Sequence, residues 1–198
     1  MRYDAEHKHR TRDRILREAA KALRDSGPNG ISVASVMREA GLTHGGFYAH
    51  FSSKEALVAD TIAYAMAQSH AVRAEEMAGK SPREALCASI DQYLSMEHRE
   101  RRAEGCPVAG LASDLPRLAS AEAQQAFAAG VEDWVVQVED VLMGIGYAAP
   151  KGEARSVVSE LVGALILARC EPDSDRARAL IEGARHQLKA RLGLNNYS

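Results

Sequence analysis

The chain has 198 residues and a mass of 21.4 kDa, and 46% of its residues are hydrophobic, which is enough to build a buried core. Its longest apolar run, residues 161–168, is too short to span a bilayer, and the charged N-terminus lacks an apolar signal region. Cys87, Cys106 and Cys170 form no CxxC pair, which argues against a zinc site or a disulfide framework. We therefore expect a cytoplasmic globular protein without a metal, a cofactor or a membrane contact.

Charge is distributed unevenly along the chain. Residues 1–54 contain ten Lys and Arg against six Asp and Glu, a net charge of +4, whereas residues 55–198 contain fifteen against twenty-one, a net charge of −6. Four of the seven histidines also lie in the basic part: His7, His9, His44 and His50. A solvated charged surface is the simplest explanation of such an imbalance, but a basic segment also suits nucleic acid.

The N-terminal part reads as three helices. The first is predicted over about residues 9–25 and ends at the turn 26–30, because an apolar face with helical spacing stops there. Ser32 can cap a second, short helix over residues 33–40. Gly41 can then leave that helix with a positive φ, Leu42 can fill the corner, and Thr43 can cap the next helix. The order of helix, tight turn and helix predicts a helix-turn-helix motif.

Six further helices are predicted after this motif, and no segment shows the two-residue alternation of a strand. Capping signals mark three of their starts: Ser52 with Glu55, Ser81 with Pro82, and Ser120. The predicted helices cover about residues 54–77, 82–96, 107–113, 121–143, 157–168 and 174–192. The expected fold class is all-α with about nine helices, divided into a helix-turn-helix domain over residues 1–53 and a ligand-sensing and dimerisation domain over residues 54–198.

A specific residue pattern runs through the predicted motif. Its members are Thr43, Gly45, Phe47, Tyr48, His50, Phe51, Lys54, Glu55 and Leu57. In these residues, and upstream in Thr11, Ile15, Leu16, Ala19, Ala20, Gly30, Ser32 and Val33, the chain resembles the N-terminal domain of the TetR family of transcriptional regulators. Met37 departs from the pattern, which usually has a small residue there. The resemblance implies a homodimeric repressor that binds a pseudo-palindromic operator in double-stranded DNA and is released by a small-molecule inducer.

Individual DNA-binding residues follow from the motif and from the resemblance. In a helix-turn-helix the first residues of the second helix face base edges, so we expect Thr43, His44 and Gly45 to contact bases. The resemblance assigns the phosphate contacts, which come from Tyr48, His50 and Lys54. Ser32 and the amides that follow it can hold a further phosphate. The side chains of Arg10, Arg12 and Arg14 either reach the DNA or form a solvated stripe.

The last two helices are candidates for a dimer interface. Residues 157–168 are apolar on almost every side, and residues 174–192 carry an apolar stripe. Two such helices from each of two subunits would make a four-helix interface, which is how TetR-like proteins pair. We expect Leu165, Ile181 and Leu188 in this interface. The alternative is that both helices simply close the core of a single chain.

A ligand pocket is expected between the helices at 82–96 and 121–143. Its predicted wall contains Tyr93, Met96, Cys106, Phe127, Val131 and Trp134, although residues of these types at this spacing also suit an ordinary core. The stretch around Cys106 is similar to one in a branch of the TetR family, some of whose members respond to electrophiles or oxidants. As a cap before Pro107, with Arg101 and Arg102 nearby, Cys106 would favour its thiolate; an inert buried thiol is the alternative.

Two other classes of protein fit the sequence less well. No glycine-rich phosphate loop, GxSxG or HExxH motif is present, and His70, His98 and His186 stand apart from one another, so we expect no catalytic residue and no enzyme. A helical adaptor that binds proteins but not DNA would explain the apolar C-terminal helices. It would leave residues 43–54 without a purpose.

Overall fold

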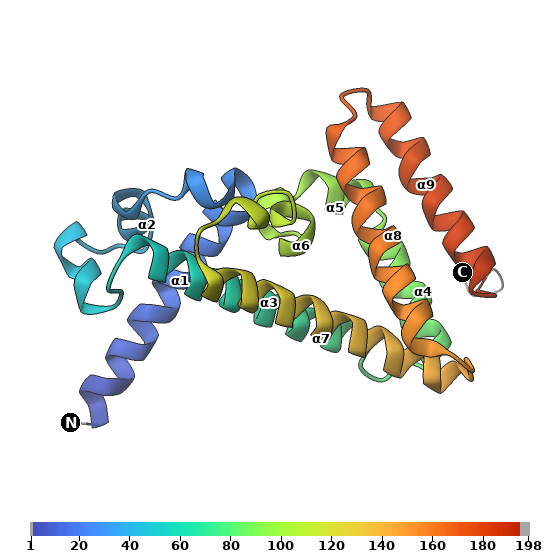
Figure 1. Cartoon of the computed structure of the whole chain (residues 1–198), viewed down its shortest axis with the longest axis horizontal. Coiled ribbons are helices and arrows are strands. Elements are labelled where there is room, and N and C mark those ends of the chain that lie inside the picture. Colours follow the sequence, from blue (N-terminus) through green and yellow to red (C-terminus); the bar gives the residue numbers. More distant parts are fainter. Residues whose placement is uncertain (1, 195–198) are drawn as a thin grey trace.

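The structure is a computed structural model that describes the backbone of residues 2–194 and the side chains from Glu6 onward (Figure 1). Over this range the chain is helical and contains no strand, which confirms the all-α fold class. The α-helices are α1 (Arg2–Gly30), α2 (Val33–Glu39), α3 (Lys54–Met77), α4 (Pro82–Tyr93), α5 (Met96–Glu100), α6 (Pro107–Leu111), α7 (Ala121–Ile145), α8 (Pro150–Cys170) and α9 (Ser174–Arg191). Three short 3₁₀ helices are η1 (His44–Ala49), η2 (Arg102–Glu104) and η3 (Leu115–Arg117).

Several helix ends follow directly from local sequence. Ser81 and Glu84 form a complete capping box at the start of α4, and the Ser120 hydroxyl accepts the amide of Ala123 at the start of α7. Gly146, with a φ of 98°, ends α7. These ends lie where the sequence predicts them, because each depends on contacts among neighbouring residues.

Other boundaries differ from the prediction. Helix α1 continues to Gly30 through a kink at Gly27, which has a φ of 70° and precedes Pro28. The cap of α3 is Ser53, whose hydroxyl accepts the amide of Ala56 at 3.1 Å, and not Ser52. Helix α8 begins at Pro150 and not near Val157, because a proline suits the first turn of a helix as well as a loop.

The helices form an N-terminal unit and a longer C-terminal unit (Figure 1). Helices α1 and α2, η1 and the start of α3 pack around Leu23, Met37 and Phe47, which are fully buried. In the C-terminal unit α3 lies along α7, and α8 and α9 stand as a pair across their far end. Helix α3 contacts both α1 and α7, so it connects the two units.

Helices α3 and α7 pack closely at Gly130. A Cβ at this position would lie 2.6 Å from the Cβ of Met66, so only glycine fits.

In the described part of the chain no helix is long and apolar enough to cross a membrane.

Candidate DNA interface and ligand pocket

The turn between α2 and η1 has the predicted geometry. The Ser32 hydroxyl accepts the amide of Ser35 at 3.4 Å and caps α2, and Gly41 has a φ of 67°. The amide of Leu42 donates a hydrogen bond to the carbonyl of Met37 at 2.8 Å, which caps the C-terminal end of α2. This turn directs the chain from α2 into the segment that was predicted to contact base edges.

That segment is a 3₁₀ helix and not an α-helix. The consecutive residues Gly45 and Gly46 explain the difference, because glycine costs roughly 1 kcal/mol relative to alanine in an α-helix. A Cβ at Gly46 would lie 3.7 Å from Cε of Met37, an ordinary contact, so the large side chain of Met37 is accommodated below this segment. Met37 itself is buried, and its departure from the family pattern does not open the motif.

One face of η1 is buried and the other is exposed. Phe47 and Phe51 lie in the core with stacked rings whose centroids are 5.7 Å apart. On the opposite side Thr43, His44 and Gly45 are exposed, and the side chain of Tyr48 is 73% exposed. Thr43 occupies the cap position, but its hydroxyl makes no capping hydrogen bond, which differs from the expectation that it caps the helix.

Basic side chains surround this exposed segment. His50 is half-buried, and its Nδ1 lies buried without a hydrogen-bond partner among the residues described. Burial first, and then the charges of Lys8 and Arg12, lower the pKa of His50. Lys54 is half-buried in the first turn of α3, and Ser32 is exposed at the start of α2.

The arginines of α1 divide into two groups. Arg12 forms an ion pair with Asp60 at 2.6 Å and lies over the ring of Phe51, 4.9 Å from its centroid. It therefore fastens α1 to the start of α3. Arg10 and Arg14 are exposed.

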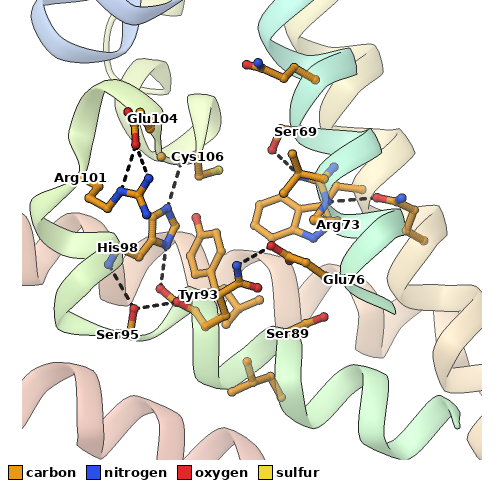
Figure 2. Close-up of a pocket in the computed structure, with 18 of the residues that line it drawn as sticks. Ser69, Arg73, Glu76, Ser89, Tyr93, Ser95, His98, Arg101, Glu104 and Cys106 are labelled. Carbon is orange, nitrogen blue, oxygen red and sulfur yellow. Dashed lines mark hydrogen bonds and ion pairs between the residues drawn. The ribbon is translucent and has the colours of Figure 1, made fainter. Parts of the chain in front are cut away.

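A cavity of about 550 Å³ lies between α1 and the helices of the C-terminal unit and is drawn in Figure 2. Of the six predicted wall residues, Tyr93, Cys106 and Trp134 line it. Met96, Phe127 and Val131 do not; they are partly buried and pack against the core. The apolar pattern correctly indicated the helices α4 and α7, but it could not separate the residues on the cavity from those beside it.

The polar part of the cavity wall was not predicted from the sequence. Ser69, Arg73 and Glu76 of α3 line the cavity, and they recur at a spacing of three or four residues, which is the only sequence signal they give. Helix α1 adds further side chains that are far away in the sequence: Arg17, Lys21 and Arg24.

Aromatic and polar groups meet around Trp134. The ring centroid of Tyr93 lies 5.3 Å from that of Trp134, and the guanidinium of Arg73 lies 4.8 Å from the same indole ring. The imidazole of His98 meets the Tyr93 ring edge to face at 4.6 Å. In Figure 2 the side chains of Tyr93, His98 and Cys106 occupy one side of the pocket and those of Ser69 and Arg73 the other.

The backbone at Cys106 is held by His98. The amide of Cys106 donates to Nε2 of His98 at 3.0 Å, and Nδ1 of His98 lies 2.8 Å from the carbonyl of Tyr93. Both bonds form only when the imidazole is neutral with its proton on Nδ1. Burial is the main cause that lowers the pKa of His98, although the bond to the Tyr93 carbonyl raises it.

Cys106 is buried and occupies the predicted cap position before Pro107, but its thiol makes no capping bond. The expected positive neighbours are engaged elsewhere, because Arg101 pairs with Glu97 and Glu104, and Arg102 donates to a backbone carbonyl of α8. Three other guanidinium groups lie within electrostatic range of the thiol: Arg24, Arg73 and Arg169.

The C-terminal helices bury the residues that were expected at a dimer interface. Leu165, Ile181 and Leu188 are 0%, 1% and 0% exposed, because α8 and α9 cover them within one chain. This packing matches the alternative in which both helices close the core of a single chain. The large apolar side chains that α8 and α9 leave exposed are Leu167, at 61%, and Leu180, at 42%.

The comparisons with known proteins agree with this architecture. Residues 15–61 match the family model described as bacterial regulatory proteins of the tetR family. No curated protein matches the sequence.

Solved structures extend the likeness to the whole fold. The structure of E. coli NemR in its reduced form has a TM-score of 0.80 and 20% identity, over 92% of this chain and 96% of that one. A TetR transcriptional regulator from Chloroflexus aurantiacus has a TM-score of 0.78 and 23% identity, over 95% and 96%. A TetR-family regulator from Agrobacterium tumefaciens has a TM-score of 0.75 and 23% identity, over 91% and 98%. Residues 15–61 therefore form a DNA-binding domain of the tetR type, and the chain as a whole shares the fold of solved TetR-family regulators.

Proposed function

We propose that this protein is a repressor that binds a pseudo-palindromic operator as a homodimer and leaves it when a small molecule occupies the cavity. The exposed face of η1 carries the proposal. Polar and small side chains from Thr43 to Tyr48 point outward above a buried Phe47 and Phe51, and nothing in the described chain covers them. A surface of this kind can enter the major groove of DNA.

The proposed contacts fall into two kinds. Thr43, His44 and Gly45 read base edges, and the free hydroxyl of Thr43 is available as a donor or an acceptor. Tyr48, His50, Lys54 and Ser32 hold phosphates on either side. Changing a phosphate contact lowers the affinity for all sequences, whereas changing a base contact alters which sequence is preferred.

The proposed dimer uses the outer surface of α8 and α9. Leu167 and Leu180 border a shallow groove whose other members include the small residues Gly163, Ala164 and Gly183. A Cβ at Gly163 or Gly183 would meet nothing within 4 Å in the single chain, so these positions leave room for close approach of a second copy. Leu165, Ile181 and Leu188 support this surface from below.

The position of the cavity suggests how a ligand can act on DNA binding. Arg17, Lys21 and Arg24 place α1, the first helix of the DNA-binding unit, in the cavity wall. A bound molecule thus contacts both units at once. It releases DNA if it favours an arrangement in which the two η1 segments no longer match one turn of the duplex, roughly 34–36 Å.

Selection of duplexes from a random library by the purified protein tests the function. We expect the selected sequences to contain an inverted repeat, and the duplex to bind with an affinity that falls steeply with salt. The Lys54→Ala protein should bind every selected duplex more weakly without changing their order. Recovery of no enriched sequence, together with no duplex binding at low salt, would contradict the proposal.

A further inference from the structure

The cavity is positively charged although the C-terminal part of the chain is acidic. Five cationic and three acidic side chains line it, and three of the cations come from α1 and not from the acidic residues 55–198: Arg17, Lys21 and Arg24. Arg101 pairs with both Glu97 and Glu104, so these three charges sum to −1, and the other five, four cations and Glu76, sum to +3. The remaining cations include two guanidinium groups at the inner wall, Arg24 and Arg73, and neither forms an ion pair within the described residues.

Arg73 is held by neutral groups. Its Nε donates to Oε1 of Gln137 at 3.0 Å, and its Nη1 donates to the hydroxyl of Ser69 at 2.7 Å. The indole of Trp134 lies against the guanidinium at 4.8 Å. These contacts fix the plane of the group without neutralising it, and burial lowers the pKa of Arg73 because a charge in this position lacks water. An anion beside Arg73 would relieve that cost.

Tyr93 supplies an unused hydrogen-bond donor to the same place. Its hydroxyl is buried and has no nitrogen or oxygen partner among the residues described; only the Cys106 sulfur, a weak hydrogen-bonding group, lies beside it. Burial, and after it the neighbouring Cys106 sulfur, raises the pKa of Tyr93, so the hydroxyl keeps its proton. Tyr93 and Arg73 face the pocket from opposite sides, both contact Trp134, and they lie within electrostatic range of each other, so an acidic group placed between them can interact with both.

The rest of the wall suits an apolar body. Aliphatic side chains from α4, α7 and α8 line the cavity: Leu86, Ile90, Val138, Val141, Val157 and Leu161. The cavity volume of about 550 Å³ is within the range of pockets that hold drug-sized molecules. Glu76, which the amide of Gln92 holds, is also part of the wall, and its charge disfavours a second acidic group on the ligand.

We propose that the cavity binds an organic monoanion with an aromatic or aliphatic body, whose acidic group lies against Arg73 and accepts a hydrogen bond from Tyr93. The acidic group is a carboxylate or a sulfonate. This inference rests on the proposed function, which requires an effector, and it names the chemical class of that effector.

Two dyes of similar shape but different charge test whether the cavity prefers an anion. 1-Anilinonaphthalene-8-sulfonate is a monoanion, and N-phenyl-1-naphthylamine has the same rings without the sulfonate. Both become fluorescent in apolar sites, and both accept energy from tryptophan, so quenching of the single tryptophan, Trp134, reports a dye bound in the part of the molecule that holds the cavity. We expect the sulfonate to bind about tenfold more tightly than the neutral amine in the full-length protein.

Substitutions in the cavity wall test whether Arg73 and Tyr93 cause the preference for the sulfonate dye. Arg73→Met and Tyr93→Phe should each weaken binding of the sulfonate about tenfold or more and leave binding of the amine nearly unchanged, whereas Arg73→Lys should retain part of the preference. Arg117→Met is the matched control, since Arg117 is exposed and does not line the cavity. If Arg73→Met fails to fold, as judged from its thermal unfolding, the Tyr93→Phe and Arg73→Lys proteins decide.

Three results would overturn the inference: equal affinity for both dyes, loss of preference in Arg117→Met as large as in Arg73→Met, or sulfonate binding that leaves Trp134 unquenched. Duplex binding is measured in parallel without dye. A protein that binds DNA but shows no preference for the sulfonate disproves the ligand class alone. A protein that prefers the sulfonate but binds no DNA disproves the proposed function alone.

Discussion

The imidazole of His98 connects the end of α4 to the backbone that precedes α6. Its Nε2 accepts a hydrogen bond from the amide of Cys106, and its Nδ1 donates one to the carbonyl of Tyr93. The neighbouring Gly105 packs closely against the ring, since a Cβ there would lie 3.0 Å from Nε2 of His98. The cavity wall at Cys106 therefore depends on a neutral histidine. This dependence makes the stability of the wall sensitive to pH.

Replacing His98 by Gln should destabilise the protein by about 1–2 kcal/mol at pH 7.5, because two hydrogen bonds are lost or weakened. Since burial lowers the pKa of His98 in the folded chain, the unfolded chain takes up the proton first as the pH falls. The stabilisation is complete above the unfolded pKa, about 6.5, and is lost as the pH falls through the lower folded value. Thermal unfolding of the wild type and of His98→Gln, measured between pH 7.5 and 5, should show that the difference in their free energies of unfolding decreases as the pH falls. A difference that does not change with pH would contradict this prediction.

Gly45 offers a test of base contact that does not disturb the fold. A Cβ at this position would meet nothing within 4 Å, so Gly45→Ala should leave the melting temperature unchanged or raise stability by up to about 1 kcal/mol. The added methyl group would nevertheless stand between the backbone and the groove floor, so duplex affinity should fall. Gly152→Ala is the control and should leave affinity unchanged, because a Cβ there also meets nothing within 4 Å and Gly152 lies in α8, outside the DNA-binding unit.

Cys106 and Cys170 form a natural comparison for a thiol-reactive ligand. Cys170 is exposed, whereas Cys106 is buried in the cavity wall near three guanidinium groups. We expect N-ethylmaleimide to release DNA from the wild-type protein and from Cys170→Ser, but not from Cys106→Ser, because only the adduct at Cys106 fills the cavity. Mass spectrometry locates the adduct. Release from Cys106→Ser that equals release from the wild type would assign the effect to another site.

At the scale of elements, sequence signals are reliable where the deciding contacts are local. The capping box at Ser81 and the positive φ at Gly41 follow from residues within one turn. The choice of Ser53 over Ser52 as the cap of α3 depends on one residue of register, which the pattern of a serine followed by Glu55 does not define. Packing between residues far apart in the sequence is harder to predict. The apolar stripe of α9 indicates a buried face, but it does not indicate whether the same chain or a partner chain buries it.

Substitutions on α8 distinguish residues that are buried within one chain from residues that a partner chain would bury. Asp at Leu165 places a charge in the core of one chain and should prevent folding, whereas Asp at Leu167, which is 61% exposed, should give a folded monomer. Sedimentation velocity and circular dichroism report assembly and folding separately. A Leu167→Asp protein that remains a dimer at micromolar concentration would move the interface away from this surface.

At the scale of the whole molecule, the cavity lies where the two units meet. Its wall takes residues from α1 as well as from α3, α4, α7 and α8, and Gly110 of α6 lies so close to the backbone of Arg24 that a Cβ there would be 3.3 Å from its carbonyl oxygen. The sequence could not predict the part of the wall that comes from α1, because Arg17 and Lys21 look like ordinary solvated residues of a surface helix. Tertiary packing alone brings them to the cavity. A ligand that weakens DNA binding by a given factor must itself be bound more weakly, by the same factor, when operator is present.

The number of chains bound to each duplex shows whether the protein acts on DNA as a dimer. Sedimentation of a fluorescent duplex from the selection, titrated with protein at low salt, gives the number of chains in the complex. The account predicts two chains on each inverted repeat, and much weaker binding to a single half-site or by Leu167→Asp, since one half-site alone gives too little affinity. A complex of one chain per duplex with full affinity, or no complex with any duplex, would contradict it.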